Sequence, residues 1–258
     1  MTTTARPLLA TRGLEVSIAG IGICRDLDLD IEAGQCWAIL GRNGAGKTTL
    51  LHTLAGLRAP DAGAIEIDGR PLPAFAPREL ARFRGLLPQD DSDPFPATAL
   101  ETVLVGRHPH LSRWRWEGAE DLRIAREALS AADLAGAEKR DVRTLSGGER
   151  RRVALATLLA QQPRLFLLDE PSSHLDLSHQ IALLDRLVQL ARGGGRALIM
   201  ALHDVNLATR CCDHALLLDR GSAVAGPAEQ LLDGERLSAL YGVPLRTLRD
   251  DGRNFFVT

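Results

Sequence analysis

Three stretches in the first third of the chain alternate apolar and polar residues, which is the pattern of half-buried antiparallel strands. They are residues 14–18 (LEVSI), 24–31 (CRDLDLDI) and 64–70 (AIEIDGR), and the last contains the tight-turn dipeptide Asp68-Gly69. Between them, residues 36–40 (CWAIL) form a continuous apolar run. Such a run predicts a strand that is covered on both faces.

Helical spacing begins after this strand and returns in the middle of the chain. Leu50, Leu51, Leu54 and Leu57 mark one side of a predicted helix, which Pro60-Asp61 is expected to end. From about Pro94 to Asp141 the pattern is helical and contains no strand-like run, with residues 118–137 as the clearest helix. This segment indicates a helical insertion or subdomain.

After Pro163 strand and helix patterns alternate. Apolar runs predict strands at residues 165–169, 197–202 and 215–219, and a helix is predicted around 179–191. Strands that alternate with helices indicate an α/β sheet with crossover connections.

The composition limits the class of partner. The 258 residues carry a formal net charge of −2, with 45% hydrophobic and 25% charged residues, enough for one large domain or two small lobes around a shared core. We expect no nucleic-acid partner, because a general nucleic-acid binder carries a basic excess. The cluster Arg150, Arg151 and Arg152 is interpreted as a solvated helix face.

The cysteines and the N-terminal residues indicate the cellular compartment of the protein. Cys24, Cys36, Cys211 and Cys212 have no metal-ligand spacing and are predicted to be buried thiols in a reducing cytosol. The first residues lack the pattern of a signal peptide. No apolar stretch approaches the roughly 20 residues that a bilayer span requires. We therefore expect a soluble, cytoplasmic chain.

Residues 41–48 (GRNGAGKT) fit the phosphate-loop pattern G-x-x-x-x-G-K-[ST] in full. Glycines allow backbone N–H groups to curl around a phosphate, and the helix that follows points its positive end at the anion. Lys47 is expected to reach the β- and γ-phosphates and the Thr48 hydroxyl to ligate Mg²⁺. The position between an apolar strand and a helix favours this reading over a chance glycine-rich turn.

Asp169 and Glu170 lie at the carboxyl end of the predicted buried strand at 165–169. Ligands of open α/β sheets bind at the carboxyl ends of the strands. Asp169 is expected to hold Mg²⁺, directly or through water, and Glu170 to orient and deprotonate the attacking water. A surface turn with two acids is the alternative, which the phosphate loop makes less favourable.

Residues 146–149 (SGGE) are a capping-box pattern before the helical run at 150–162. Ser146 and Glu149 can cap that helix without any ligand. However, two glycines in a first turn each cost about 1 kcal/mol of helix propensity relative to alanine. Gly147 and Gly148 leave backbone N–H groups bare at a positive helix end, which suits the γ-phosphate of a nucleotide. Both interpretations are compatible.

In their order along the chain, 41–48, 145–149 and 165–170, the three motifs resemble those of ABC-transporter ATPase subunits, and the resemblance covers essentially the whole chain. It implies that Gln89 contacts Mg²⁺ and senses a transmembrane partner, that Asp176 is the aspartate of the D-loop (172–176), and that His203 contacts the γ-phosphate. A lone histidine after an apolar strand is by itself more often structural, and its place beside the phosphate site reverses that preference. The implied nucleotide-binding residues are Gly41, Asn43, Gly44, Ala45, Gly46, Lys47, Thr48, Thr49, Ser146, Gly147, Gly148 and Asp176. The implied catalytic residues are Glu170, His203 and Gln89, and the implied Mg²⁺ ligands are Thr48, Gln89 and Asp169.

The resemblance also implies the fold, a P-loop NTPase cassette with a RecA-like core sheet, an antiparallel β subdomain and a helical subdomain. Residues 1–258 would form one ATPase domain, in which 1–89 and 142–258 make the β subdomain and the core. About 90–141 would form the helical subdomain that faces the permease. One copy of each motif implies two chains in head-to-tail register with two ATP molecules between them, so that a second subunit completes the half site at Ser146.

Three further segments resemble importers of iron chelates (heme or ferric siderophores) and of cobalamin: residues 105–110, 172–180 and 237–248. This implies uptake through a separate permease dimer, which a periplasmic or surface binding protein supplies, at the cytoplasmic face of the inner membrane. The permease is expected to dock on the residues after Gln89, and Trp114 and Trp116 either contact it or pack within the insertion. A soluble ABC ATPase and an exporter ATPase are the alternatives.

One position departs from the family pattern. The family usually stacks adenine on an aromatic residue upstream of the phosphate loop. The matching position falls near Ile18, and no aromatic residue is nearby. We expect a weaker apolar contact with the base there.

Overall fold

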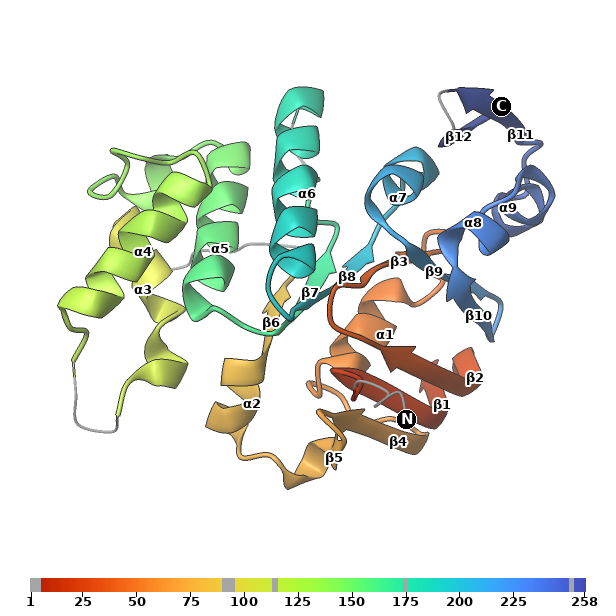
Figure 1. The fold of residues 1–258 in the computed structure, drawn as a ribbon, viewed down its shortest axis with the longest axis horizontal. Helices are drawn as coiled ribbons and strands as arrows, with labels where there is room; N and C mark the ends of the chain where they lie inside the picture. The colour runs from red at the N-terminus through yellow and green to blue at the C-terminus, as the bar shows by residue number, and fades with distance from the viewer. Residues whose placement is uncertain (1–5, 90–95, 113–115, 174–175, 251–252) are drawn as a thin grey trace.

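The computed structural model of the protein describes residues 6–89, 96–112, 116–173, 176–250 and 253–258. Within them, two main sheets organise the fold (Figure 1). The smaller, antiparallel sheet has the order β2-β1-β4-β5, with β1 (Leu9–Ile18), β2 (Ile21–Ile31), β4 (Ala62–Ile67) and β5 (Arg70–Pro71). The larger has the order β10-β9-β3-β8-β7-β6, with β3 (Cys36–Leu40), β6 (Arg84–Leu87), β7 (Leu165–Asp169), β8 (Ala197–Ala201), β9 (His214–Asp219) and β10 (Ser222–Pro227).

The larger sheet is parallel except at one edge. Parallel pairing joins β9, β3, β8, β7 and β6, and only β10 runs antiparallel to its neighbour. Every residue of β3, β7 and β8 is buried, as their continuous apolar runs predict. The carboxyl ends of these strands therefore meet at one edge of the sheet. The phosphate loop, Glu170 and His203 follow β3, β7 and β8 at that edge, whereas the 146–149 motif begins α5.

Helices cover both faces of this sheet and form a separate group at one end (Figure 1). The helices are α1 (Lys47–Leu54), α2 (Pro77–Phe83), α3 (Ala99–Val105), α4 (Ala119–Ala131), α5 (Gly147–Gln161), α6 (Leu177–Arg192), α7 (Val205–Cys211), α8 (Ala228–Leu231) and α9 (Gly234–Tyr241), with 3₁₀ turns η1 (Leu72–Ala74), η2 (His108–His110) and η3 (Val142–Thr144). The group at the end of the molecule consists of α3, α4 and α5. A two-stranded hairpin of β11 (Arg246–Asp250) and β12 (Arg253–Val257) lies near the C-terminus.

Three hydrophobic clusters hold these layers together. Alternate residues of β3 face opposite sides: Cys36, Ala38 and Leu40 join the cluster that includes α6 and α7, while Trp37 and Ile39 join the one that includes α1 and the antiparallel sheet. The third cluster lies among α3, α4 and α5. Each large aliphatic side chain buried in this way contributes about 1.5–3 kcal/mol relative to full exposure, so the clusters fix the sheet edge that carries the motifs.

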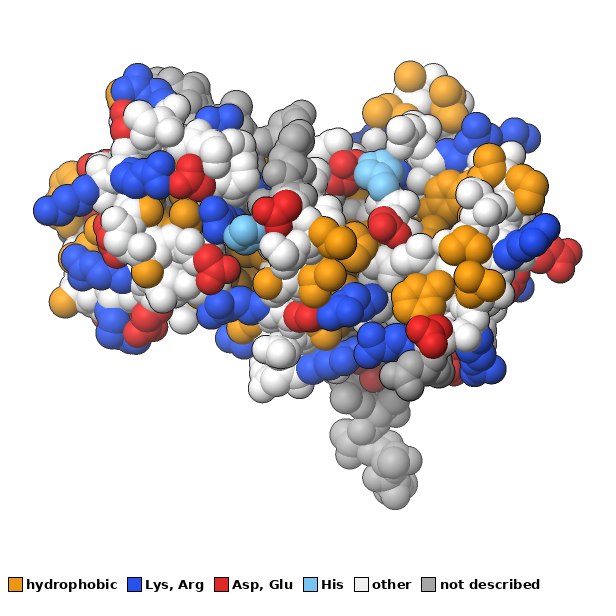
Figure 2. Space-filling model, turned by 90° about the horizontal axis from the view of Figure 1, so that it is seen from above, with side chains coloured by type: hydrophobic (Ala, Val, Ile, Leu, Met, Phe, Trp, Pro, Cys, Tyr) orange, Lys and Arg blue, Asp and Glu red, His pale blue; other side chains and the backbone are white. Residues whose placement is uncertain are grey.

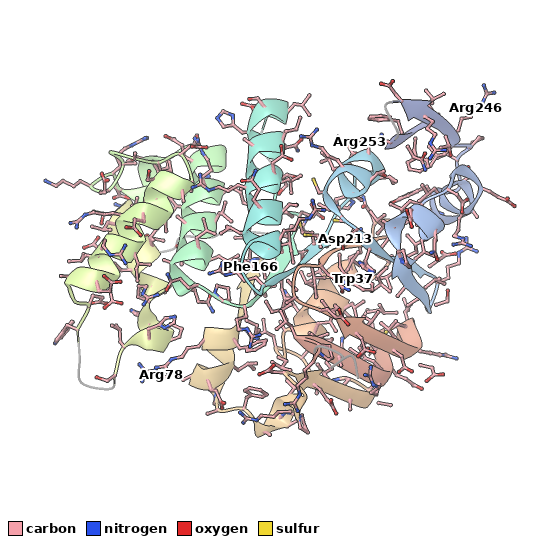
Figure 3. All side chains as sticks on the ribbon, in the orientation of Figure 1. Trp37, Arg78, Phe166, Asp213, Arg246 and Arg253 are labelled. Carbon is pink, nitrogen blue, oxygen red and sulfur yellow. The ribbon has the colours of Figure 1, made fainter. Side chains whose placement is uncertain are left out.

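Polar contacts attach the helical group to the sheet. Arg107, 6% exposed, donates to the Ala160 carbonyl at 2.7 Å and to the Asp121 carboxylate at 2.9 Å. Gln161 at the end of α5 donates to backbone carbonyls of α2 and of the first residue of β6, at 2.5 and 2.9 Å. Arg78 reaches from α2 to two carbonyls of η2, at 3.1 and 3.2 Å (Figure 3). The far end of α5 is therefore fixed to the core.

Most of the predicted elements are confirmed, and some boundaries are not. Asp68 and Gly69 form the predicted turn between β4 and β5, both with positive φ (48° and 61°). The predicted helix after the phosphate loop ends at Leu54, and Leu57 is 59% exposed instead of facing the core. The elements α2, β6, β10, α8, α9, β11 and β12 were not predicted, because their short or mostly exposed segments have no clear period.

The four cysteines are buried and free, as expected. Burial raises the pKa of the Cys24 thiol to about 11 and that of Cys36 to about 12, so both are protonated at neutral pH. Trp116 is 89% exposed, whereas Trp114 lies outside the described residues. On the face in Figure 2, basic and acidic side chains are interspersed with apolar ones. Nowhere in the described ranges is a helix both long and apolar enough to span a bilayer.

Candidate nucleotide site

The phosphate loop joins β3 to α1 at the carboxyl edge of the sheet. Gly46 is the N-cap of α1 with φ of 94°, and a Cβ there would lie 2.5 Å from the Ile23 side chain. Both the left-handed backbone and the close approach of β2 therefore require glycine. Gly44 also has positive φ (79°). The loop presents backbone N–H groups ahead of a helix N-terminus, which is an anion-binding arrangement.

Lys47 lies inside this loop and is only 6% exposed. Its ammonium group donates to the Gly41 carbonyl at 2.9 Å and to the Arg42 carbonyl at 3.4 Å. Burial lowers the pKa of Lys47, while the nearby carboxylates of Glu170 and Asp169 act in the opposite direction. A buried ammonium held only by loop carbonyls gains a stronger partner when an anion enters the loop.

Asp169 ends β7 with 1% exposure, and neither carboxylate oxygen has a hydrogen-bond partner among the described residues. The Thr48 side chain, although outside hydrogen-bonding geometry, lowers the pKa of Asp169, but the larger effect of burial raises it. Orphaned carboxylate oxygens beside a hydroxyl fit a hard divalent cation. No cluster of three His, Cys, Asp or Glu metal ligands occurs in the part of the chain that the structure describes. Mg²⁺ needs none, since it takes one or two carboxylates together with waters and phosphate oxygens.

Glu170 follows in a left-handed conformation, with φ of 47°. Its N–H donates to the Ala201 carbonyl of β8 at 3.1 Å, and its own carbonyl accepts from the Ser173 hydroxyl at 2.9 Å. The carboxylate is 15% exposed and hydrogen-bonds to Nε2 of His203, which is 46% exposed. A non-glycine residue keeps this conformation only where the surroundings hold it, and such residues cluster at functional sites.

These segments share one pocket of about 490 Å³. Its lining comprises Ile18, Asn43, Gly44, Gly46, Lys47, Thr48, Thr49, Gln89, Glu170 and His203. The structure thus brings the phosphate-loop residues among the predicted nucleotide residues, six of the twelve, together with Gln89, Glu170 and His203. Asp169 and Gly41 lie next to Lys47 but outside the lining, and Ala45 packs against the cluster around α1. Ile18 is 46% exposed at the pocket.

Ser146, Gly147 and Gly148 do not line this pocket. Ser146 caps α5 with the predicted capping box: its hydroxyl accepts from the Glu149 N–H at 3.2 Å, and Glu149 accepts from the Ser146 N–H at 2.8 Å. The Arg140 guanidinium, followed by these Ser146 contacts, lowers the pKa of Glu149 to about 2. A Cβ at Gly147 would meet nothing within 4 Å. Within the described ranges, no contact therefore demands glycine at that position.

Asp176 is also separate from the pocket. It is the N-cap of α6, where it accepts from the His179 N–H at 3.0 Å, and that contact lowers the pKa of Asp176. The adjacent D-loop residues 174–175 lie outside the described residues, as do residues 90–95 after Gln89.

The arginine cluster of α5 contradicts its sequence interpretation, since Arg150 and Arg152 are half-buried and Arg151 is buried. Arg151 was expected on a solvated face of α5, but it is 4% exposed and donates to backbone carbonyls next to Gln89 and Glu170. The helical period contained the signal: Leu155 and Leu158 lie four and seven positions later and are also buried, so Arg151 shares the inward face.

Known proteins with similar sequences identify the family to which this arrangement belongs. Residues 24–173 match the ABC transporter family model. The hemin import ATP-binding protein HmuV of Nocardia farcinica is 42% identical over 246 residues, covering 93% of this chain and 84% of the relative. The ferric enterobactin transport ATP-binding protein FepC of Escherichia coli is 39% identical over 232 residues, covering 88% and 84%.

Solved structures with a similar fold also come from ABC transporters. A chain of an inward-facing ABC transporter assigned to the metal-chelate type superposes with a TM-score of 0.84 at 30% identity, covering 97% of this chain and 96% of that one. A dimeric bacterial ABC transporter cassette, MJ0796, superposes with a TM-score of 0.75 at 27% identity, covering 85% and 98%.

Proposed function

Since the chain belongs to the ABC transporter family, we propose that it is the subunit that powers uptake of an iron chelate, heme or a ferric siderophore, through a separate permease. ATP-binding subunits of such import systems hydrolyse ATP. The observation that carries the proposal is the convergence of a complete phosphate loop, Glu170 and His203 on one pocket. The relatives named for hemin and ferric enterobactin favour an iron chelate over cobalamin.

The phosphates of ATP would occupy the loop from Gly41 to Thr49. Lys47 would exchange its carbonyl contacts for phosphate oxygens, and the N–H groups from Asn43 to Gly46 would surround the anion. Thr48, Asp169 and Gln89 would hold Mg²⁺, and the bound cation would neutralise charge on the phosphates. The orphaned oxygens of Asp169 beside Thr48 support this assignment.

Hydrolysis would depend on Glu170 and His203. Glu170 would accept the proton of the attacking water, as a general base held at hydrogen-bonding distance. The bond from His203 Nε2 to the Glu170 carboxylate supports a role for His203 in orienting that base until the γ-phosphate arrives. His203 would then turn to the phosphate, which its 46% exposure permits. Glu170 would thereby be freed for catalysis.

A second copy of the chain would complete the site. Ser146, Gly147 and Gly148 present an exposed helix N-terminus away from their own pocket, and we assign them, with Asp176, to the nucleotide of the partner. Cassettes of this family form dimers. Two chains in head-to-tail register would enclose two ATP molecules, and ATP binding would close the dimer because it stabilises the closed state alone.

The helical segment would face the permease. Residues of about 90–141 would form the helical subdomain, and 1–89 with 142–258 the β subdomain and core. The exposed Trp116 and the residues after Gln89 are assigned to the permease contact. Import ATPase subunits are peripheral membrane proteins, and the cytoplasmic face of the inner membrane is the proposed site. A periplasmic or surface binding protein would deliver the cargo.

The test is transport by the complex co-purified with its permease and reconstituted in liposomes. The binding protein is added after loading with heme, a ferric siderophore or cobalamin, and both ATP hydrolysis and uptake are measured. Uptake with heme or a ferric siderophore, absent in an otherwise identical Glu170→Gln complex, is the expected result. Hydrolysis with no permease bound and no response to cargo would instead favour a soluble ABC ATPase. Outward movement of cargo would favour an exporter.

A further inference from the structure

Arg151 joins α5 to the ends of two strands of the larger sheet. Leu87 of β6 and Leu168 of β7 are the last residues paired between these strands. Beyond them, the chain continues as Pro88-Gln89 on one side and Asp169-Glu170-Pro171 on the other. Carbonyl groups past the last pair need donors from elsewhere, since buried carbonyls are rarely left unpaired.

Each of the three guanidinium nitrogens of Arg151 contacts a different part of this set of carbonyls. Nη1 donates to Pro88 at 2.5 Å and lies 3.4 Å from the Gln89 carbonyl. Nη2 donates to Asp169 at 2.7 Å and to Glu170 at 3.0 Å. Nε is 3.4 Å from the Pro171 carbonyl. One buried side chain therefore bridges the backbone that carries Gln89 and the backbone that carries Asp169 and Glu170.

Only arginine has the geometry for this bridge. Its planar fork presents five N–H donors in fixed directions, whereas a lysine ammonium is a single point with three donors. A lysine here could keep the charge but could not contact both strand ends in the same way. The contacts also help to hold the left-handed Glu170, because its carbonyl is one of the acceptors.

Arg151 also lies close to the half site on its own helix. Ser146 is the N-cap of α5, five residues before Arg151, which corresponds to about 7.5 Å along the helix axis. A movement of the α5 N-terminus, when Ser146 and Gly147 engage the nucleotide of a second copy, would be carried through this rigid first turn. The guanidinium would transmit it to the backbone of Gln89 and Glu170.

We propose that Arg151 is a positioning residue that couples the two ATP sites of the dimer: it transmits occupancy of the half site at Ser146 to Gln89 and Glu170 of the same chain. The inference rests on the proposed function, because it needs hydrolysis at Glu170 and a dimer closed by ATP. The inference adds a link, within one subunit, between the half site at Ser146 and the catalytic residue Glu170. The expected consequence is that ATP hydrolysis is cooperative in ATP and that this cooperativity depends on Arg151.

The test compares Arg151→Lys with a matched control, Arg107→Lys. Arg107 is also a buried arginine that donates to a backbone carbonyl of α5, but that carbonyl, of Ala160, lies at the far end of the helix. In the complex with the permease, kcat, KM and the Hill coefficient for ATP are measured, together with nucleotide affinity and thermal stability. Arg151→Gln is the second variant if the lysine variant does not fold.

We expect Arg151→Lys to lower kcat about 10- to 100-fold, the effect of misplacing a reacting group by roughly 1 Å, and to bring the Hill coefficient toward unity. Nucleotide affinity should change by less than about threefold, because the phosphate loop is untouched. Arg107→Lys should lose a comparable amount of thermal stability and keep the wild-type kcat and Hill coefficient.

Wild-type kcat and cooperativity in Arg151→Lys would overturn the inference. So would an equal loss in Arg107→Lys, which would mean that stability alone was affected. A wild-type Hill coefficient of unity would overturn the coupling. The proposed function fails separately, if the wild-type complex does not hydrolyse ATP or if Glu170→Gln leaves hydrolysis intact.

Discussion

Replacing Asp169 by asparagine should make the nucleotide-free protein more stable while removing its response to Mg²⁺. The carboxylate is buried, and its two oxygens have no hydrogen-bond partner. Burial raises the pKa of Asp169 despite the opposing effects of Thr48, His52 and Lys47, so the ionised form is less favourable in the folded chain than in the unfolded one. Asparagine keeps the shape and removes the charge.

The size of the effect follows from the cost of a buried, unsatisfied group. That cost is about 1–3 kcal/mol, and because the amide is still polar and the attraction to Lys47 is lost, the lower end, about 1 kcal/mol, is expected. For a chain of this length the melting temperature should rise by about 3 °C.

The pH dependence has a definite sign. A raised pKa means that the folded chain holds this proton more firmly, so the wild type loses stability as pH rises through the folded pKa. The advantage of Asp169→Asn should therefore be absent below the unfolded value of about 3.9 and complete above the folded pKa of Asp169.

Thermal unfolding measures both parts of this prediction. With a chelator and no nucleotide, Asp169→Asn should melt at a higher temperature than the wild type. The unfolding free energy of Asp185→Asn should lie within about 0.5 kcal/mol of the wild-type value, since Asp185 is a half-exposed partner of Arg210. With ATP present, adding Mg²⁺ should stabilise the wild type and Asp185→Asn but not Asp169→Asn. A destabilised Asp169→Asn protein, or one that still responds to Mg²⁺, would refute the assignment of this carboxylate.

Four other substitutions test the remaining parts of the site. Glu170→Gln should slow hydrolysis by roughly 10²- to 10⁴-fold and leave ATP binding intact, and a loss of binding in a titration would contradict its role as base. Lys47→Ala should weaken ATP binding by about 10- to 100-fold, the value of a charge-assisted hydrogen bond, so unchanged affinity would exclude the phosphate-loop assignment. Ser146→Arg should leave nucleotide binding by the monomer intact but abolish ATP-induced dimers in size-exclusion chromatography, and dimers that persist would refute the shared site. Ile18→Tyr should bind ATP about fivefold more tightly by adding roughly 1 kcal/mol of stacking on adenine, and calorimetry that shows no gain would place the base elsewhere.

The elements that carry the chemistry were predictable because their signals are local. The runs at 36–40 and 165–169 are buried at every position; the phosphate loop follows the first, and the second ends in Asp169 and is followed by Glu170. The strand β6 is only four residues long, contains Gly85 and follows α2 without a break, so no period marks it. Its position nevertheless places Gln89 at the pocket.

The partners of Arg151 could not be read from the chain in the same way. The inward face of α5 is visible in its period, but the acceptors are carbonyls 62 and 63 residues earlier and 18 to 20 residues later. Only the parallel register of β6 and β7 brings those carbonyls together. A run of three arginines therefore suggests a solvated face until the sheet is assembled.

The attachment of α5 also supports the proposal that a second chain completes the site. Arg151 fixes the helix near its N-terminus and Gln161 fixes its other end, so the helix cannot swing Ser146 and Gly147 over the pocket of its own chain. The space that the described residues leave open around Gly147 is where we propose that a nucleotide held by another copy binds. The same contact that separates the two half sites within a chain links Ser146 to Glu170. Because each chain would supply the half site of its partner, ATP bound to one copy should act on the Glu170 of the other through Arg151.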